Sequence, residues 1–143
     1  MAKTESTNAE SFTKEERAAM KERARELKIK QSQAEAEQEV LDRIASMRED
    51  DREIASGLHA LVKEHAPHLG AKTWYGMPAY TVDGKVVLFF KDAAKFKSKY
   101  ATLGFEEASQ LDDGTMWPTS FALLDLKANE KQVIDLIKRA AGV

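Results

Sequence analysis

Two strand-like segments separated by an Asp-Gly pair limit the folds that are open to this chain. Residues 73–81 and 85–90 are rich in aromatic and β-branched side chains, and Val82-Asp83-Gly84 joins them. Asp-Gly favours the tight turn of a β-hairpin, so the two segments are predicted to pair as antiparallel neighbours. The second segment is almost continuously apolar, which is typical of a central strand covered on both faces.

Two further strands are expected downstream, at residues 99–105 and 115–123, with a turn at 111–114 between them. Pro118 lies inside the last of these segments and indicates an edge, a bulge or an interruption there, because proline cannot donate to a strand ladder. Strands that follow one another without crossover helices pair antiparallel.

Three segments with helical spacing surround these strands. Residues 33–47 place Val40, Leu41, Ile44 and Met47 on one face. The next helix begins near Asp50, which has capping-box spacing to Glu53, and the last covers residues 129–141. The predicted fold is an α+β two-layer sandwich: a mainly antiparallel sheet of about four to five strands packed by helices, with an extra N-terminal helix.

The N-terminal part of the chain differs from the rest in composition. Residues 1–12 show no apolar periodicity and are expected to be disordered. Residues 13–32 are predicted to form a charged helical extension that begins with a capping box at Thr13 and Glu16. Because its apolar stripe is thin, we expect this helix to be mobile or docked on a partner. Residues 33–143 form the predicted α+β domain.

Composition excludes several classes of protein. The 143 residues suit one domain of ordinary size. No cysteine is present, which excludes disulfides, thiolate metal sites and a cysteine nucleophile. The net charge of −2 argues against a general nucleic-acid binder. The chain carries neither an apolar run of membrane-spanning length nor a signal-peptide pattern, so no membrane is expected and a cytoplasmic location is predicted.

The segment Trp74-Tyr75-Gly76-Met77-Pro78-Ala79-Tyr80 carries a resemblance to a known family. With the Gly-Lys turn and the apolar strand at 84–90 behind it, it resembles the YdhG-like family, a bacterial domain of unknown function that is sometimes described as frataxin-like. The segments at 99–105 and 111–123 are similar to a sub-type of that family. The resemblance covers about residues 40–141 and implies no catalytic motif. Some members are described as intracellular iron chaperones.

Aromatic and methionine side chains gather in and after the strand region. Trp and Tyr have polar tips and often line an interface or a pocket mouth, so one face of the sheet is a candidate binding surface with a basic rim. A small aromatic or acidic ligand and a protein or peptide partner both remain open, as does plain packing under helices. The candidate ligand-binding residues are Trp74, Tyr75, Met77, Tyr80, Lys97 and Trp117.

Carboxylates gather at the junction between the two central helices. Residues 31–53 hold eight acidic and three basic side chains. Hard cations prefer oxygen ligands, so an iron site is the alternative hypothesis. Arginines at 43, 48 and 52 are spaced to pair with these acids, which favours a capped, solvated helix face instead. The candidate metal ligands are Glu49, Asp50, Asp51 and Glu53.

Other sequence features carry weaker signals. His65 and His68 have His-x-x-His spacing, but Pro67 between them indicates that the two side chains diverge. Residues 14–30 hold seven basic and four acidic side chains without aromatic residues, which weakens a nucleic-acid hypothesis. No nucleophile elbow and no Gly-rich phosphate loop is present. The sequence therefore favours a binding protein over an enzyme.

Overall fold

A computed structural model describes residues 12–143 of the chain. The chain divides into two compact units, Met1–Ala34 and Glu35–Val143. The predicted disorder of residues 1–12 concerns residues outside those described, apart from Phe12, whose carbonyl accepts a hydrogen bond from Arg17 at 3.2 Å.

The first helix, α2, is a single element, Lys14–Ala45, that runs from the first unit into the second. Thr13 caps it as predicted, because its hydroxyl accepts a hydrogen bond from the backbone N–H of Glu16 at 3.0 Å. The two separate helices expected on either side of residue 32 are one helix. No proline or glycine lies between Lys14 and Ala45, and the residues at the expected break, Gln31-Ser32-Gln33, do not stop a helix whose neighbours are strong helix formers.

The second unit contains two more α-helices, α3 (Glu49–His65) and α4 (Glu130–Ala141), and the short 3₁₀ helix η1 (Lys127–Asn129). Its sheet has five antiparallel strands in the order β1-β2-β3-β4-β5. These are β1 (Gly70–Trp74), β2 (Met77–Val82), β3 (Lys85–Lys91), β4 (Thr102–Phe105) and β5 (Ser120–Ala122). The α+β class with helices on an antiparallel sheet is confirmed.

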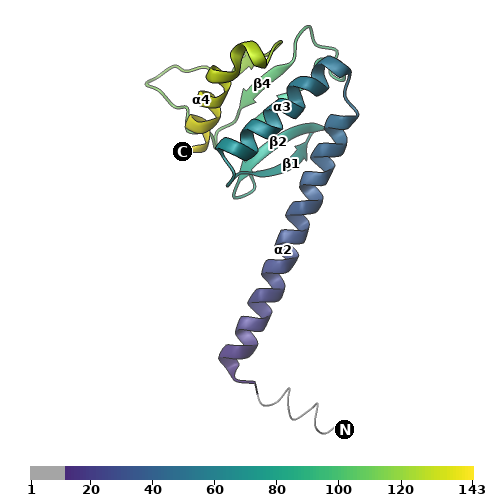
Figure 1. The fold of residues 1–143 in the computed structure, drawn as a ribbon. Coiled ribbons are helices and arrows are strands. Elements are labelled where there is room, and N and C mark those ends of the chain that lie inside the picture. The colour runs from purple at the N-terminus through teal and green to yellow at the C-terminus, as the bar shows by residue number, and fades with distance from the viewer. Residues whose placement is uncertain (1–11) are drawn as a thin grey trace. The chain divides into compact units, whose positions relative to one another are not determined.

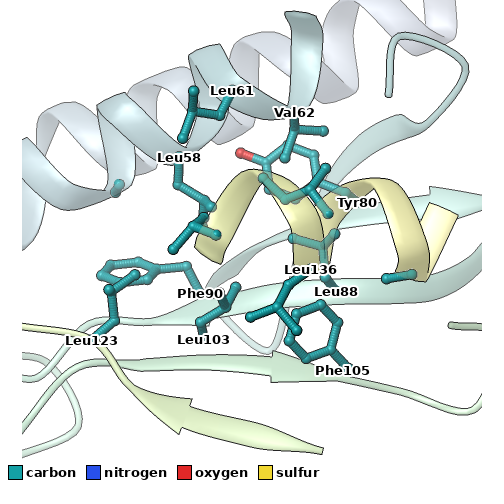
Figure 2. Packing of buried hydrophobic residues seen from close by; sticks show 14 of the residues in the cluster. Leu58, Leu61, Val62, Tyr80, Leu88, Phe90, Leu103, Phe105, Leu123 and Leu136 are labelled. Carbon is teal, nitrogen blue, oxygen red and sulfur yellow. The ribbon is translucent and has the colours of Figure 1, made fainter. Parts of the chain in front are cut away.

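The helices α3 and α4 lie on the same face of the sheet (Figure 1). The core fills the space between them and the strands: α3 contributes Leu58 and Val62, and the strands contribute Tyr80, Leu88 and Phe90 (Figure 2). β3 lies at the centre of the sheet, as its apolar sequence predicts, but helices cover only one of its faces. Because α3 and α4 both lie on one side of the sheet, the side chains of its other face pack without a helix above them.

The segment 73–81 is two strands and not one. Tyr75 and Gly76 both have positive φ, at 51° and 76°, and form the two-residue turn of a hairpin that pairs Trp74 with Met77. The Asp83-Gly84 turn forms as predicted, with φ of 49° and 77°. β5 covers only three residues of the predicted strand at 115–123, and it begins two residues after Pro118, at an edge of the sheet.

The start of α3 differs from the predicted capping box. No side chain caps this helix in the N-cap position. Asp50 instead pairs with the Arg48 guanidinium, with Oδ1–Nε and Oδ2–Nη2 distances of 2.6 and 2.9 Å. The pairing of Arg48 with an acid of this cluster agrees with the prediction. Within residues 12–143, Glu53 makes no reciprocal bond to the N-cap backbone.

Candidate functional site

The two faces of the sheet carry different side chains because of the hairpin register. Pairing of Trp74 with Met77 places both on the face away from the helices, with Ala79 next along β2. A bulge opposite Tyr80 and Thr81 absorbs Val87, so that Val87 and Leu88 both belong to the helix-covered core. The buried aliphatic side chains Met77, Ala79 and Val86 do not belong to that core cluster and mark the second face.

Phe89 and Trp74 cover this second face. Their ring centroids are 5.4 Å apart, so an aromatic pair extends from β1 to β3. The Phe89 ring also lies directly on Gly104 of β4, at a place where a Cβ atom would overlap it. Ala79, which lies opposite Phe89 across the two strands, is fully buried on this face. Both rings remain partly exposed, so the outer side of the pair is open to a ligand.

The Tyr75-Gly76 turn extends this aromatic surface at the end of β1. The Tyr75 ring packs edge-on against Trp74, with centroids 5.1 Å apart, yet 79% of Tyr75 is exposed. The ammonium group of Lys95 lies against Gly76, where it occupies the space a Cβ would need. The turn thus brings an exposed aromatic ring next to the loop that follows β3.

That loop is rich in lysine. Residues 91–99 contain Lys91, Lys95, Lys97 and Lys99, and within residues 12–143 none of the four forms an ion pair. The ammonium groups of Lys91 and Lys95 instead lie 5.5 and 5.4 Å from the centroid of the Phe96 ring. Lys97 is exposed and has a positive φ of 52°. Cationic and aromatic groups are therefore presented together.

Two buried carboxylates fix this loop. Asp92 accepts hydrogen bonds from Nη2 of Arg43 at 2.8 and 2.9 Å, and Nε of Arg43 donates to the carbonyl of Gly76 at 2.8 Å. Arg43 of α2 thereby holds both the turn and the start of the loop. From α3, the buried Asp51 accepts a hydrogen bond from the N–H of Ala94 at 3.0 Å. The backbone of the loop is therefore preorganised, and little of it needs to be ordered on binding.

A hollow opens beside the loop, lined by Arg43, Arg48, Asp92 and Lys95 together with Ser46, Met47 and Ala94. Arg43 pairs with Asp92 and Arg48 pairs with Asp50, so the positive charge left at this hollow is that of Lys95, which favours a negatively charged group. We call the combined surface of Trp74, Tyr75, Phe89, Lys91, Lys95, Phe96, Lys97 and this hollow the aromatic–lysine face.

The structure brings together four of the six predicted ligand-binding residues and separates two. Trp74, Tyr75, Met77 and Lys97 lie on or beside the aromatic–lysine face, although Met77 is buried beneath it. Trp117 lies on the segment leading into β5, at the opposite edge of the sheet from β1, where it lines a hollow with Phe105 and Pro118.

Tyr80 is a correction to the predicted binding set. It is only 1% exposed and lies under α3 on the helix-covered face (Figure 2). Its hydroxyl is 2.8 Å from Nδ1 of His59, whose Nε2 is 3.2 Å from a carboxylate oxygen of Glu37. Since the carboxylate can only accept, Nε2–H donates to Glu37 and the Tyr80 hydroxyl donates to Nδ1. The His59 side chain is largely buried, with 12% of its surface exposed.

The pKa values of three members of this network are shifted by burial and by neighbouring charges. Burial lowers the pKa of His59 against the opposing pull of Glu37. The Lys63 ammonium, 3.0 Å from Glu37, lowers the pKa of that carboxyl. Burial raises the pKa of Tyr80. The network therefore holds a neutral imidazole between a phenol and a carboxylate, and it fastens α2 and α3 to β2.

The four candidate metal ligands serve separate purposes. Asp51 binds the loop at Ala94, and the Arg48 guanidinium lowers the pKa of Asp50 through their hydrogen bonds. Glu49 and Glu53 are exposed. Within residues 12–143, no three His, Asp or Glu side chains are grouped in a way that could hold a metal ion.

Among the helices of the same residues, none has the length and apolar character that crossing a membrane requires.

Sequence reasoning missed the residues that complete the face. Phe89 and Lys91 alternate with the buried Phe90, so period-two spacing already placed them on one side of β3 and Phe90 on the other. The four lysines of residues 91–99 were visible as a cluster, but nothing in the sequence places Lys95 beside Gly76.

No family model, no curated protein and no solved structure matches the chain. The resemblance to the YdhG-like family therefore stays a prediction.

Proposed function

We propose that the second unit is a binding module whose aromatic–lysine face recognises an acidic segment of a partner protein. Support comes first from the lysine-rich loop, which presents unpaired ammonium groups next to exposed aromatic rings. Charge complementarity of this kind selects partners and speeds association. Membership of the YdhG-like family and a cytoplasmic location belong to the same proposal, on the Tyr75-Gly76-Met77-Pro78 segment and on the absence of cysteine.

The observation that carries the proposal is that buried charged groups hold this loop in place. Arg43 and Asp92 form a buried ion pair, and burying charge is expensive unless both partners are well bonded. A third charged group, Asp51, is buried to bind the backbone of the same loop. These contacts fix the backbone of the loop, and with it the points from which the lysine side chains extend.

The shape of the surface favours a peptide over a small molecule. Its aromatic rings come from β1, the turn and β3, and its lysines spread along the loop, so these groups line an extended surface. An extended segment can place an apolar side chain on Trp74 and Phe89 and acidic side chains near Lys91, Lys95 and Lys97. Nothing observed in residues 12–143 favours the iron alternative over this function.

The test uses labelled peptides of about twelve residues that carry several Glu and Asp around one Phe, with Gln and Asn replacing the acids in the matched control. Fluorescence anisotropy with the full chain should show binding of the acidic peptide only. The triple variant K91E/K95E/K97E should weaken binding roughly ten- to hundredfold, because three attractive charge pairs become repulsive. Phe89→Ala should weaken it about tenfold by removing the aromatic platform.

The control variant K127E/K131E/K138E changes the net charge equally but lies on η1 and α4, and it should bind as the unchanged chain does. Equal loss in both triple variants would reduce the effect to net charge and contradict the proposal. Tighter binding of a single-stranded DNA of matched length than of the acidic peptide would identify a nucleic-acid surface instead. Binding of the acidic peptide that survives K91E/K95E/K97E would place the site elsewhere.

A further inference from the structure

A groove opens between α3 and the segment 124–130, which leads from β5 into α4. Its volume is about 680 Å³, which is within the range of sites that bind ligands. All the residues that line it belong to the second unit, and none belongs to the aromatic–lysine face. The groove is therefore a separate feature of the same unit.

The interior of the groove is apolar. Ile54 and Leu61 line it from α3, and Leu126 lines it from the opposite wall. The Leu126 side chain lies directly on Gly57, at a place where a Cβ atom would overlap it, so the missing side chain at 57 lets the two walls approach closely. Leu124 also lines the groove, and 71% of it is exposed. An occupant that covers this leucine removes apolar surface from water.

The groove follows one face of α3. The residues of α3 that line it recur three or four positions apart, which places them on one side of the helix. Asp50 and Glu53 lie toward one end of this face and Glu64 lies at the other. At a rise of 1.5 Å per residue, Asp50 and Glu64 are about 20 Å apart along the helix axis. This length matches three to four turns of a second helix.

Carboxylates dominate the rim of the groove, and some of them already have partners. Asp50 pairs with Arg48, so it adds little free negative charge. Glu64 lies 3.7 Å from the imidazole of His65, and its side chain is 72% exposed.

The remaining carboxylates have no cation beside them. Glu53 and Glu130 form no ion pair within residues 12–143. Asp125 accepts a hydrogen bond from the backbone N–H of Ala128 at 3.1 Å and likewise forms no ion pair there. Among the described residues that line the groove, Lys127 is the only cation. The rim therefore attracts positive charge.

We propose that this groove binds a basic amphipathic helix of a partner protein. The apolar stripe of that helix covers Leu124 and Leu126, and its lysine or arginine side chains lie near Glu53, Glu64 and Glu130. A purely hydrophilic cation would leave the leucines exposed, and an anionic segment would meet the acidic rim. The proposal does not depend on the acidic partner of the aromatic–lysine face, because the two surfaces differ in charge and in residues.

The probe is a fluorescent peptide of about fourteen residues, with leucines three and four positions apart and lysines on both flanks of that stripe. One control peptide replaces the lysines by glutamine, and a second keeps the charge but carries proline at its centre. Fluorescence anisotropy with the full chain should show binding of the basic helical peptide and at least about tenfold weaker binding of both controls. Circular dichroism should show that the bound peptide gains helix.

Variants of the chain locate the site by charge. E53Q/E64Q/E130Q should weaken binding about tenfold or more, because the rim loses its free carboxylates. E107Q/D112N/D113N removes equal charge from exposed acids outside the groove, and it should bind as the unchanged chain does.

A second pair of variants locates the site by shape at constant charge. Ala60→Gln places a larger side chain in the groove from an exposed position of α3 and should weaken binding about tenfold. Ala45→Gln makes the same change at an exposed alanine of α2 outside the groove and should have no effect. Chemical denaturation checks that each variant stays folded.

Four results overturn the proposal: equal losses in the two charge variants, unchanged binding to Ala60→Gln, binding of the proline peptide as tight as that of the helical one, or displacement of the peptide by an equal concentration of spermidine. The last result would identify a polyamine site instead. K91E/K95E/K97E should still bind the basic peptide, so this proposal and that for the aromatic–lysine face can fail separately.

Discussion

Phe89 and Phe90 are neighbours in the chain and lie on opposite faces of one sheet. Phe90 is fully buried under α3 and α4 among aliphatic side chains, whereas Phe89 packs on Gly104 and Trp74 and stays partly exposed. The covered face is held by a continuous core; the open face is held by one aromatic pair and a loop tied down by buried charges. On a sheet face that no helix covers, only the area beneath a few large side chains is buried. The rest of that face is available to a partner.

Substitution of the two phenylalanines should give the largest contrast. Phe90→Ala should lower the free energy of unfolding by about 3–5 kcal/mol, because it leaves a cavity in a closed core. Phe89→Ala should cost about 1–2 kcal/mol, since water can fill the space that its ring leaves. Chemical denaturation of both variants measures the difference. Equal losses would show that the open face is as much a part of the core as the covered one.

Asp92→Ala should have the next largest effect. It leaves the buried Arg43 guanidinium without its carboxylate, which costs about 3 kcal/mol or more. Asp113→Ala, at an exposed turn, serves as the control and should be close to neutral. Urea denaturation of the two variants compares them. A neutral Asp92→Ala would mean that the loop is not held by this pair.

Gly76→Ala should destabilise by about 1–2 kcal/mol, because a Cβ is strained at a φ of 76°. Gly84→Ala is a matched comparison: its φ is 77°, but no atom lies within 4 Å of the added Cβ. Any excess for Gly76→Ala therefore measures the displacement of Lys95. Thermal denaturation of the two variants side by side gives that excess. Identical losses of stability would show that the contact of Lys95 with Gly76 does not stabilise the turn.

The smallest expected effect is the pH dependence of stability that arises from His59, on the helix-covered side of the sheet. Burial lowers the pKa of His59, so the unfolded chain binds more protons than the folded one as the pH falls below the ordinary value near 6.5. Stability should therefore decrease on acidification from about pH 7 to pH 5, and again below the ordinary pKa of Glu37. His59→Gln should flatten the first decrease. A variant with an unchanged slope would contradict this assignment.

Local patterns predicted the elements of the fold well because the relevant interactions are local. The Asp83-Gly84 hairpin, the central β3 and the helix over residues 49–65 follow from turn chemistry and apolar spacing. The break expected near residue 32 did not occur, since weak helix formers flanked by strong ones remain helical.

The candidate site was less predictable, and one turn explains most of the error. Had residues 73–81 formed one strand, Trp74 and Tyr80 would share a face; the turn at Tyr75 reverses the chain and places them on opposite faces. A positive φ at tyrosine has no sequence signal of its own, because most residues adopt it only when tertiary contacts require it. The contacts of Arg43 with Gly76 and Asp92 span 33 and 49 residues, which no local pattern reveals.

The position of Arg43 has a consequence for how the molecule opens. A single guanidinium bonds the turn before β2 and the loop after β3 through different nitrogens, so a movement of Arg43 that releases one of them also disturbs its bonds to the other. Turn and loop then form one cooperative opening unit. In native-state hydrogen exchange, the amides of the turn and of the loop should exchange with a common opening free energy, distinct from that of the strands they connect.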